Sequence, residues 1–263
     1  MPRILAHDVS FHYEESGVGT PVLLLHGHPL DCTMWSPQLQ ADFPGYRLIA
    51  PDLRNLGLTT SPTHATDFTV YAHDILTLAE ALHLTRFVVV GLSMGGHVAM
   101  ELAHLAPHRL LGLVLSDTYA PLDSPEKQAG RVALADRLKA EGMRTYASEA
   151  LPKLLSASTI AHNPQLAAQV LAMMERSPAA GAADALRVRS RHRDYLSVLR
   201  SLDLMTLILV GSEDQFTPVS EATLMHENIR NSTLVVIPDT GHLPNMEDPE
   251  TFNQHLQEFL QTI

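Results

Sequence analysis

The chain has 263 residues, of which 45% are hydrophobic and 18% charged, enough for one large domain or one domain that carries an insertion. Its 29 Asp and Glu residues outnumber 18 Lys and Arg residues, and the formal charge of −11 excludes the basic face that nucleic acid requires. No apolar stretch has the length of a membrane span or of a secretory signal, so we expect a cytoplasmic protein without a membrane partner. The single cysteine, Cys32, excludes an internal disulfide and agrees with a reducing compartment.

The first part of the chain alternates short apolar runs with helical patterns. Residues 3–14 alternate apolar and polar side chains, which predicts one or two antiparallel edge strands. Further on, strands are predicted at 22–25, 46–50, 87–90 and 111–116, and helices at 68–82 and 94–105. This alternation predicts an α/β fold with a mostly parallel sheet of the eight-stranded type and helices on both faces.

The alternation of strands and helices stops between residues 121 and 202, where no apolar run typical of a buried strand occurs. Helical patterns there cover 131–141, 144–155, 164–175 and 179–199, with breaks near Gly142, Pro152, Pro164 and Pro178. Because strand connections rarely need so many residues, we expect a helical cap at 121–202 inserted into a core of 1–120 and 203–263. The core pattern resumes with strands at 207–210 and 233–237 and helices at 219–228 and 249–260.

A serine stands between glycines where a strand meets a helix, in the sequence Gly-Leu-Ser-Met-Gly-Gly at residues 91–96. The pattern G-x-S-x-G between a buried strand and a helix is typical of a nucleophile elbow, which exposes a serine hydroxyl above the sheet. The alternative is a glycine-rich turn whose serine caps the helix. We favour Ser93 as a nucleophile because the strand and the helix flank the motif as the elbow requires.

A serine nucleophile needs a histidine base and an acid that holds the histidine in one tautomer. Asp214 follows the strand at 207–210, and His242 lies in a glycine-containing loop after the last strand. Their order after Ser93 is the order expected for an elbow fold. Asp117, which follows the strand at 111–116, is the rival acid, and an Asx-turn or helix cap is the structural alternative for either aspartate.

The tetrahedral intermediate of acyl transfer needs hydrogen-bond donors for its oxyanion. We expect the amide of Met94, at the start of a helix, to supply one donor and the amide of His28, in the His-Gly-His-Pro loop at 26–29, to supply the other. For the rings of His26 and His28 we favour hydrogen bonds that brace this loop. No metal-ligand spacing accompanies them, so no metal and no cofactor are assigned, and Cys32 is interpreted as inert.

These motifs carry a family resemblance. HGHP at 26–29, PDLR at 51–54, GLSMGG at 91–96, GSEDQFTP at 211–218 and DTGHLPNMEDP at 239–249 resemble the α/β-hydrolase fold family in order and spacing. The resemblance implies Ser93 as nucleophile, His242 as base, Asp214 as acid and the amides of His28 and Met94 as oxyanion hole. Within the family the chain is similar to small carboxylesterases and 3-oxoadipate enol-lactonases. It departs from them at residues 55–60, where relatives commonly read G-x-G-x-S.

The sequence therefore predicts a cofactor-free serine hydrolase of small carboxylic esters. An enol-lactonase or lactonase with the same triad is one alternative, and a weakly catalytic ligand receptor on the same fold is another. The acidic composition argues against a dianionic substrate. Four cap arginines alternate with other residues, a spacing that scatters them around a helix, so we expect them on a solvated face. They are Arg187, Arg189, Arg191 and Arg193.

Overall fold

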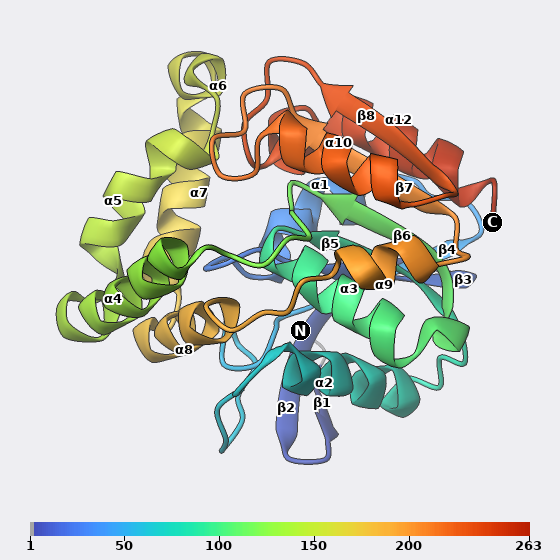
Figure 1. Cartoon of the computed structure of the whole chain (residues 1–263), viewed down its shortest axis with the longest axis horizontal. Helices are drawn as coiled ribbons and strands as arrows, with labels where there is room; N and C mark the ends of the chain where they lie inside the picture. The colour runs from blue at the N-terminus through green and yellow to red at the C-terminus, as the bar shows by residue number, and fades with distance from the viewer. Residues whose placement is uncertain (1–2) are drawn as a thin grey trace.

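The computed structural model describes residues 3–263, and its central element is one eight-stranded sheet (Figure 1). The strands lie in the order β1-β2-β4-β3-β5-β6-β7-β8. Strand β2 is antiparallel to β1 and β4, and every other pairing is parallel. The predicted α/β class with a mostly parallel sheet is thus confirmed. The strands are β1 Arg3–Ala6, β2 Val9–Gly17, β3 Thr20–Leu25, β4 Tyr46–Pro51, β5 Phe87–Leu92, β6 Leu110–Ser116, β7 Thr206–Gly211 and β8 Ser232–Ile237.

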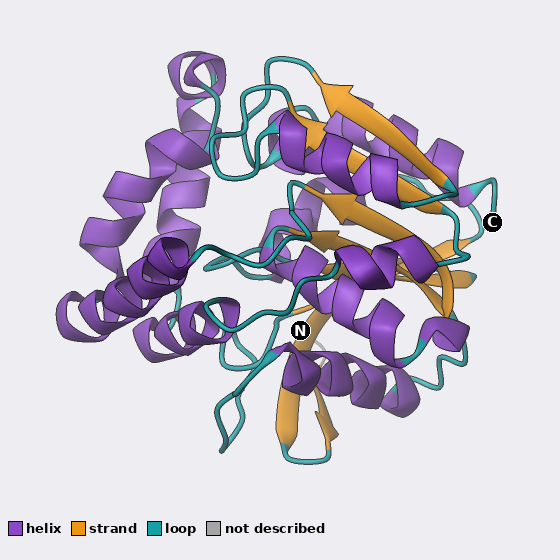
Figure 2. Ribbon diagram, in the orientation of Figure 1, coloured by secondary structure: helices purple, strands orange, loops and turns teal. Residues whose placement is uncertain are grey.

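Helices cover both faces of the sheet (Figure 2). They are α1 Ser36–Gln40, α2 Phe68–Ala81, α3 Met94–Leu105, α4 Pro125–Glu141, α5 Met143–Leu154, α6 Ala157–His162, α7 Pro164–Arg176, α8 Ala179–Arg189, α9 Leu196–Ser201, α10 Val219–Asn228, α11 Pro244–Glu247 and α12 Pro249–Leu260. Helices α2, α3 and α10 share one hydrophobic cluster with the sheet, and α1 and α12 share another on its opposite face. None of these helices is long and apolar enough to cross a bilayer.

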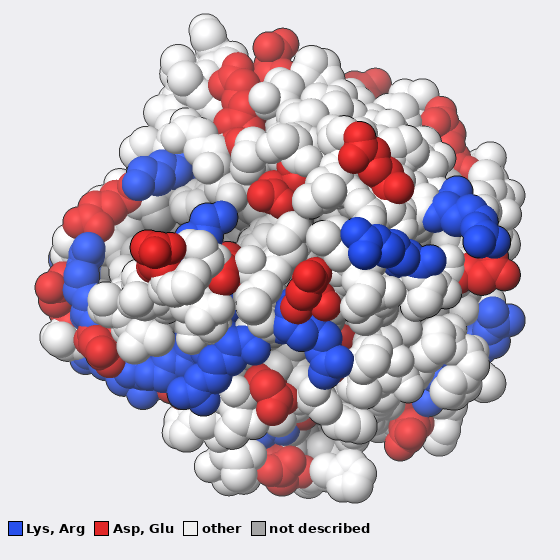
Figure 3. All heavy atoms as spheres, in the orientation of Figure 1, with Lys and Arg blue, Asp and Glu red and all other residues white. Residues whose placement is uncertain are grey.

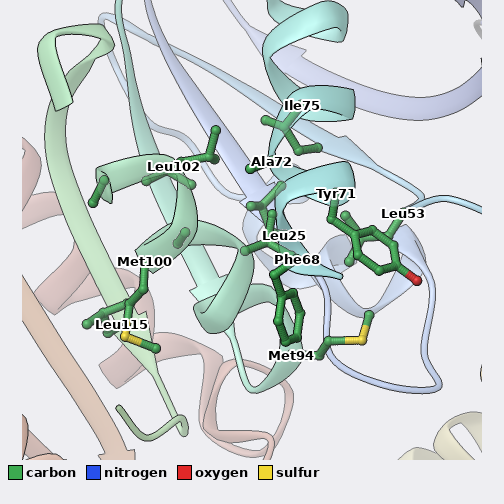
Figure 4. Close-up of a cluster of buried hydrophobic side chains, with 14 of the residues drawn as sticks. Leu25, Leu53, Phe68, Tyr71, Ala72, Ile75, Met94, Met100, Leu102 and Leu115 are labelled. Carbon is green, nitrogen blue, oxygen red and sulfur yellow. The ribbon is translucent and has the colours of Figure 1, made fainter. Parts of the chain in front are cut away.

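Strand β5 shows why the central strands are continuously apolar. Successive side chains of a strand point to opposite faces, and both faces here are covered by helices. Val89 therefore packs with α2 and α3, whereas Val88 and Val90 pack with α1 and α12. Figure 4 shows part of the first cluster, in which Phe68 and Met100 belong to α2 and α3. Full burial of one such side chain stabilises the fold by about 1.5–3 kcal/mol.

Five helices, α4 to α8, lie beyond the carboxyl ends of the strands, at the left of Figure 1. We call them the cap helices. Strands in a parallel sheet present their ligand-binding ends on this side. Helix α9, in contrast, packs against α3 and α10 of the core.

Two details of the predicted helices are wrong. The helix expected over 179–199 is two helices, because the chain turns back to the core between them, where the Tyr195 amide donates to the Ala120 carbonyl at 2.9 Å. Pro152 does not break its helix. It lies in the last turn of α5, which ends at Leu154, so almost the whole helix forms before the proline. The short α6 and α11 were not predicted.

Candidate active site

Ser93 is the single residue between β5 and α3, and its backbone has φ 54° and ψ −111°. A residue other than glycine adopts such a conformation at a cost of about 1–3 kcal/mol, so its surroundings must impose it. The Ser93 amide donates to the Ser116 carbonyl at 2.9 Å, and Thr118 Oγ1 donates to the Ser93 carbonyl at 2.8 Å. Strand β6 and the residues after it thus hold the elbow in place.

The glycines on either side of Ser93 allow the chain to pass close to itself. A Cβ atom on Gly91 would lie 2.3 Å from the carbonyl oxygen of Gly95, and one on Gly95 would lie 2.1 Å from that of Leu25. Both contacts are with backbone, which cannot move aside without disturbing the sheet. The spacing of glycine in the motif therefore has a steric cause.

The His-Gly-His-Pro loop lies against the elbow, since a Cβ atom on Gly27 would be 3.4 Å from Ser93 Cβ. The His26 ring donates from Nδ1 to the Gly27 carbonyl at 2.9 Å and accepts from the Leu53 amide at Nε2, also at 2.9 Å. His28 Nε2 donates to the Ala182 carbonyl of α8 at 2.9 Å. Both rings therefore brace the loop, as expected from the sequence.

Burial, followed by the charge of Arg189, lowers the pKa of His28 to about 3. Its ring is thus neutral at physiological pH. The amide of Met94 opens α3, where the first amides lack partners within the helix and the helix dipole favours a negative charge. Gly27 of the loop and the first residue of α3 thus both lie beside Ser93.

Asp214 and His242 form a buried pair in which Nδ1 of the ring lies 2.7 Å from Oδ2 of the carboxylate. The other oxygen, Oδ1, accepts from the Phe216 amide at 2.8 Å and from the Thr217 amide at 3.1 Å. Burial by itself would raise the pKa of Asp214, but the charge and hydrogen bond of His242 and those of Thr217 bring it below the ordinary value. The carboxylate is therefore ionised and fixes the histidine tautomer.

Asp117 lies beside this pair, and its carboxylate, that of Asp214 and a ring nitrogen of His242 fall within 4.8 Å of one another. Its oxygens accept from the Gly211 amide at 2.9 Å and from Ser116 Oγ at 2.6 Å. Burial, and then the charge of Asp214, hold the pKa of Asp117 well above its ordinary value. Asp117 is therefore protonated when Asp214 carries the charge, and the geometry favours Asp214 as the partner of His242.

The model of the alpha/beta hydrolase fold family matches residues 20–249, a span that contains Ser93, Asp214 and His242. The chain belongs to the alpha/beta hydrolase fold family. The resemblance inferred from the motifs is thereby confirmed.

The relatives of this alpha/beta hydrolase differ in the activities for which they are named. A thermophilic esterase from Thermogutta terrifontis, solved with malate bound, is 36% identical, covers 100% of this chain and 99% of its own, and has a TM-score of 0.96. The 3-oxoadipate enol-lactonase 1 of Acinetobacter baylyi is 28% identical over 89% of this chain and 85% of its own. A putative non-heme chloroperoxidase from Synechocystis is 29% identical over 96% and 95%.

A cavity of about 470 Å³ lies between the cap helices and the loop after β7 of this alpha/beta hydrolase. Ser93 and His242 do not line this cavity, but residues of its wall contact the Asp214–His242 pair and His28. Phe216, in the wall, has its ring centroid 5.2 Å from that of His242, and Thr217, also in the wall, donates to Asp214. On the opposite side Tyr146 lies 6.2 Å from the His28 ring, centroid to centroid. The volume suits a small organic molecule.

The loop that carries His242 is held by residues that the sequence analysis missed. Glu247 accepts from the Gly241 amide at 2.9 Å and from the Ser156 amide of the cap segment at 2.8 Å. The His242 amide donates to the Leu154 carbonyl of α5 at 2.8 Å. Glu247 lies five residues after His242, within the motif already quoted, but its partners come from a distant part of the chain and have no local signal.

The departure from G-x-G-x-S at residues 55–60 keeps the backbone that glycine would adopt. Asn55 has φ 57°, and asparagine tolerates this left-handed region better than most residues. Its Oδ1 accepts from the Ser61 amide at 2.9 Å. Glycine is retained at 57, where a Cβ atom would lie 2.3 Å from the Asp52 carboxylate. Asn55 thus adopts the left-handed backbone conformation that glycine most readily adopts.

Two groups of side chains in residues 3–263 are close enough to share a metal ion. One is Asp117, Asp214 and His242, whose hydrogen bonds are described above. The other is His12, Glu14 and Cys32, in a second cavity of about 530 Å³. There His12 Nδ1 lies 2.8 Å from Asp52 Oδ2, and burial raises the pKa of the Cys32 thiol. A protonated buried thiol is unreactive, in agreement with the inert role expected for Cys32.

Proposed function

We propose that this alpha/beta hydrolase is a serine hydrolase that cleaves small carboxylic esters through an acyl-enzyme intermediate. Ser93 is the nucleophile, His242 the base and Asp214 the acid, with the amides of His28 and Met94 as oxyanion hole. Within the expected insertion at residues 121–202, the cap helices α4 to α8 cover the site and select the substrate, and no cofactor takes part.

In the first half of the reaction His242 accepts the Ser93 hydroxyl proton at Nε2 while Oγ forms a bond to the ester carbonyl carbon. The two amides stabilise the negative charge that develops on the carbonyl oxygen. When the intermediate collapses, the bond to the alcohol oxygen breaks and His242 protonates the leaving alcohol. In the second half water attacks the acyl-enzyme, His242 takes its proton, and the carboxylic acid leaves as Ser93 recovers its proton.

The observation that carries this proposal is the buried Asp214–His242 pair, with 2.7 Å between Nδ1 and Oδ2, at the same sheet edge as the strained Ser93. A hydrogen bond at Nδ1 leaves Nε2 as the free ring nitrogen, as a general base requires. The similarity to an esterase from Thermogutta terrifontis over the whole chain supports an ester as the substrate.

A lactone is the second candidate, favoured by the similarity to 3-oxoadipate enol-lactonase 1. The same residues would act, but the leaving alcohol would stay joined to the acid. A ligand receptor with little turnover is the alternative outside catalysis.

The test compares wild type, Ser93→Ala and Ser201→Ala on short and medium p-nitrophenyl esters and a lactone panel. We expect Ser93→Ala to lower kcat by at least about 10³-fold, because the nucleophile is lost. Ser201 lies in α9 and serves as the control serine, since its hydroxyl only donates to the Val198 carbonyl. Equal rates for wild type and Ser93→Ala would refute the serine mechanism, whereas negligible turnover by wild type would favour the receptor.

A further inference from the structure

The cavity beside the site has a charge opposite to that of the chain. Although the formal charge is −11, the wall contains four cations, Lys127, Arg131, Lys153 and Arg189, and one carboxylate, Glu149. Figure 3 shows this side of the molecule hollowed beside the cap, with Lys and Arg atoms in and around the hollow. The region over which a substrate would lie is therefore basic in an otherwise acidic protein.

The ionic partners of these groups leave one half-buried cation, Arg189, without a carboxylate. Arg131 donates to Asp123 at 2.6 Å, and Glu149 accepts from Arg137, outside the cavity wall, at 2.5 Å. Arg189 makes no ion pair with any residue from 3 to 263, and its Nε atom is buried without a hydrogen-bond partner. Arg187, two residues earlier in α8, pairs instead with Asp136 at 2.5 Å.

Arg189 remains charged at physiological pH. Burial, and then the charge of Arg131, lower its pKa to about 10, which still leaves the guanidinium protonated near pH 7. A half-buried cation whose Nε has no hydrogen-bond partner is unfavourable, and a planar guanidinium binds a carboxylate through two parallel hydrogen bonds. An anionic group that enters the cavity would therefore gain a strong, oriented partner.

The position of Arg189 relates it to the reacting groups. Its charge is the next cause after burial of the low pKa of His28, the residue whose amide we assign to the oxyanion hole. Tyr146, in the same cavity wall, contacts the His28 ring, and Phe216 contacts the His242 ring. The cavity thus extends from Arg189 toward both sides of the proposed reaction centre.

We propose that the ester or lactone hydrolysed by this protein carries a carboxylate, which the Arg189 guanidinium binds inside the cap cavity. This inference rests on the proposed function and names its substrate class. For Arg189 it replaces the expectation from the sequence that the cap arginines lie on a solvated face, because docking of the cap places Arg189 in the cavity wall.

The kinetic test uses two matched substrate pairs in a pH-stat assay. Monoethyl succinate against ethyl butyrate places the carboxylate on the acyl part, and 3-acetoxypropanoate against propyl acetate places it on the alcohol part. For each pair we compare the kcat/KM of the anionic substrate with that of its neutral partner. For at least one pair we expect Arg189→Met to lower this ratio by about 10- to 100-fold, the effect of losing a charge-assisted hydrogen bond. Arg187→Met, the control, removes one charge from the same helix and should change the ratio less than about threefold.

An unchanged ratio in Arg189→Met for both pairs, or an equal fall in Arg187→Met, would overturn the inference. Arg189→Gln is the second variant should Arg189→Met not fold. Loss of an unpaired, half-buried charge should leave Tm unchanged or higher in both.

A binding measurement separates failure of this inference from failure of the proposed function. Titration calorimetry measures the Kd of monoethyl succinate and of 3-acetoxypropanoate for Ser93→Ala and for Ser93→Ala/Arg189→Met, neither of which needs turnover. We expect at least about tenfold weaker binding of one of them to the double variant. If wild type hydrolyses no ester or lactone, the proposed function fails, and equal Kd values in the two variants would then refute the anionic site as well.

Discussion

At the scale of single residues, two aspartates that follow neighbouring strands hold different protonation states. Contact with His242 lowers the pKa of Asp214, so its carboxylate is ionised. Burial and the Asp214 charge raise the pKa of Asp117, so Asp117 stays protonated. The sequence favoured Asp214 on loop placement and chain order. The structure adds the physical reason, which is that two adjacent buried carboxylates cannot both ionise.

We predict that Asp214→Asn lowers kcat for ester hydrolysis by about 10³- to 10⁴-fold, because an amide cannot hold His242 in the tautomer with a free Nε2. Asp117→Asn mimics the protonated acid and should lower kcat by less than about tenfold. Steady-state rates of both variants on one p-nitrophenyl ester provide the comparison. A larger loss in Asp117→Asn would reverse the assignment of the acid.

Residue identity was sufficient for Ser93 and His242 as candidates because each lies in a local motif with a required backbone shape. It was insufficient for Arg189. An arginine on a helix is exposed or buried according to which face docks, and the alternation of arginines through residues 187–193 has no helical period that would indicate that face.

At the scale of elements, local sequence predicted most of the sheet and its helices closely. Helices α3, α10 and α12 have the predicted bounds. Helix α3 follows the elbow, α10 follows Pro218, and the Asp248 side chain caps α12 by accepting from the Thr251 amide. The connection between α8 and α9 was missed. Residues 190–195 have helix-compatible composition, and the chain leaves the helix there because His192 and Tyr195 become buried against the core.

The glycines of the elbow provide the prediction at this scale. Gly95→Ala places a methyl group 2.1 Å from the Leu25 carbonyl oxygen and should lower the free energy of unfolding by more than about 2 kcal/mol. Gly130→Ala, in exposed α4 with no atom within 4 Å of the new Cβ, should raise it by about 0.5–1 kcal/mol. Urea unfolding of both variants measures the difference. Similar stabilities would show that the elbow tolerates a side chain at 95.

At the scale of the whole molecule, one buried carboxylate connects the core to the cap helices. Asp123 follows β6 and accepts from Arg131 of α4 at 2.6 Å and from the Tyr119 hydroxyl at 2.9 Å. Its Oδ2 also lies 3.6 Å from His192 Nε2, in the connection to α9. Burial would raise the pKa of Asp123, but His192 and Arg131 hold it well below the ordinary value.

We predict that Asp123→Asn lowers the free energy of unfolding by about 3 kcal/mol at pH 7, because Arg131 is left without its counter-ion. Asp136→Asn, which breaks the exposed pair with Arg187, should cost less than about 1 kcal/mol.

The effect of Asp123→Asn should depend on pH. A depressed pKa contributes stability above the pKa of the unfolded aspartate, about 3.9, and that contribution is lost as pH falls through the folded value. The difference in Tm between wild type and Asp123→Asn should therefore shrink below about pH 4. A difference that is constant from pH 7 to pH 3 would mean that the charge of Asp123 does not stabilise the fold.

The sequence by itself determined the sheet, the elbow and the order of the candidate catalytic residues. These features depend on apolar periodicity and on glycines whose local geometry admits few alternatives, as at Gly91 and Gly95. Only the tertiary structure decided which aspartate is ionised, which arginine of residues 187–193 lines the cavity and what holds the His242 loop. Each of these depends on contacts between residues distant in the chain, such as Asp117 with Asp214 or Glu247 with Ser156, and burial and charge act through those contacts rather than along the sequence.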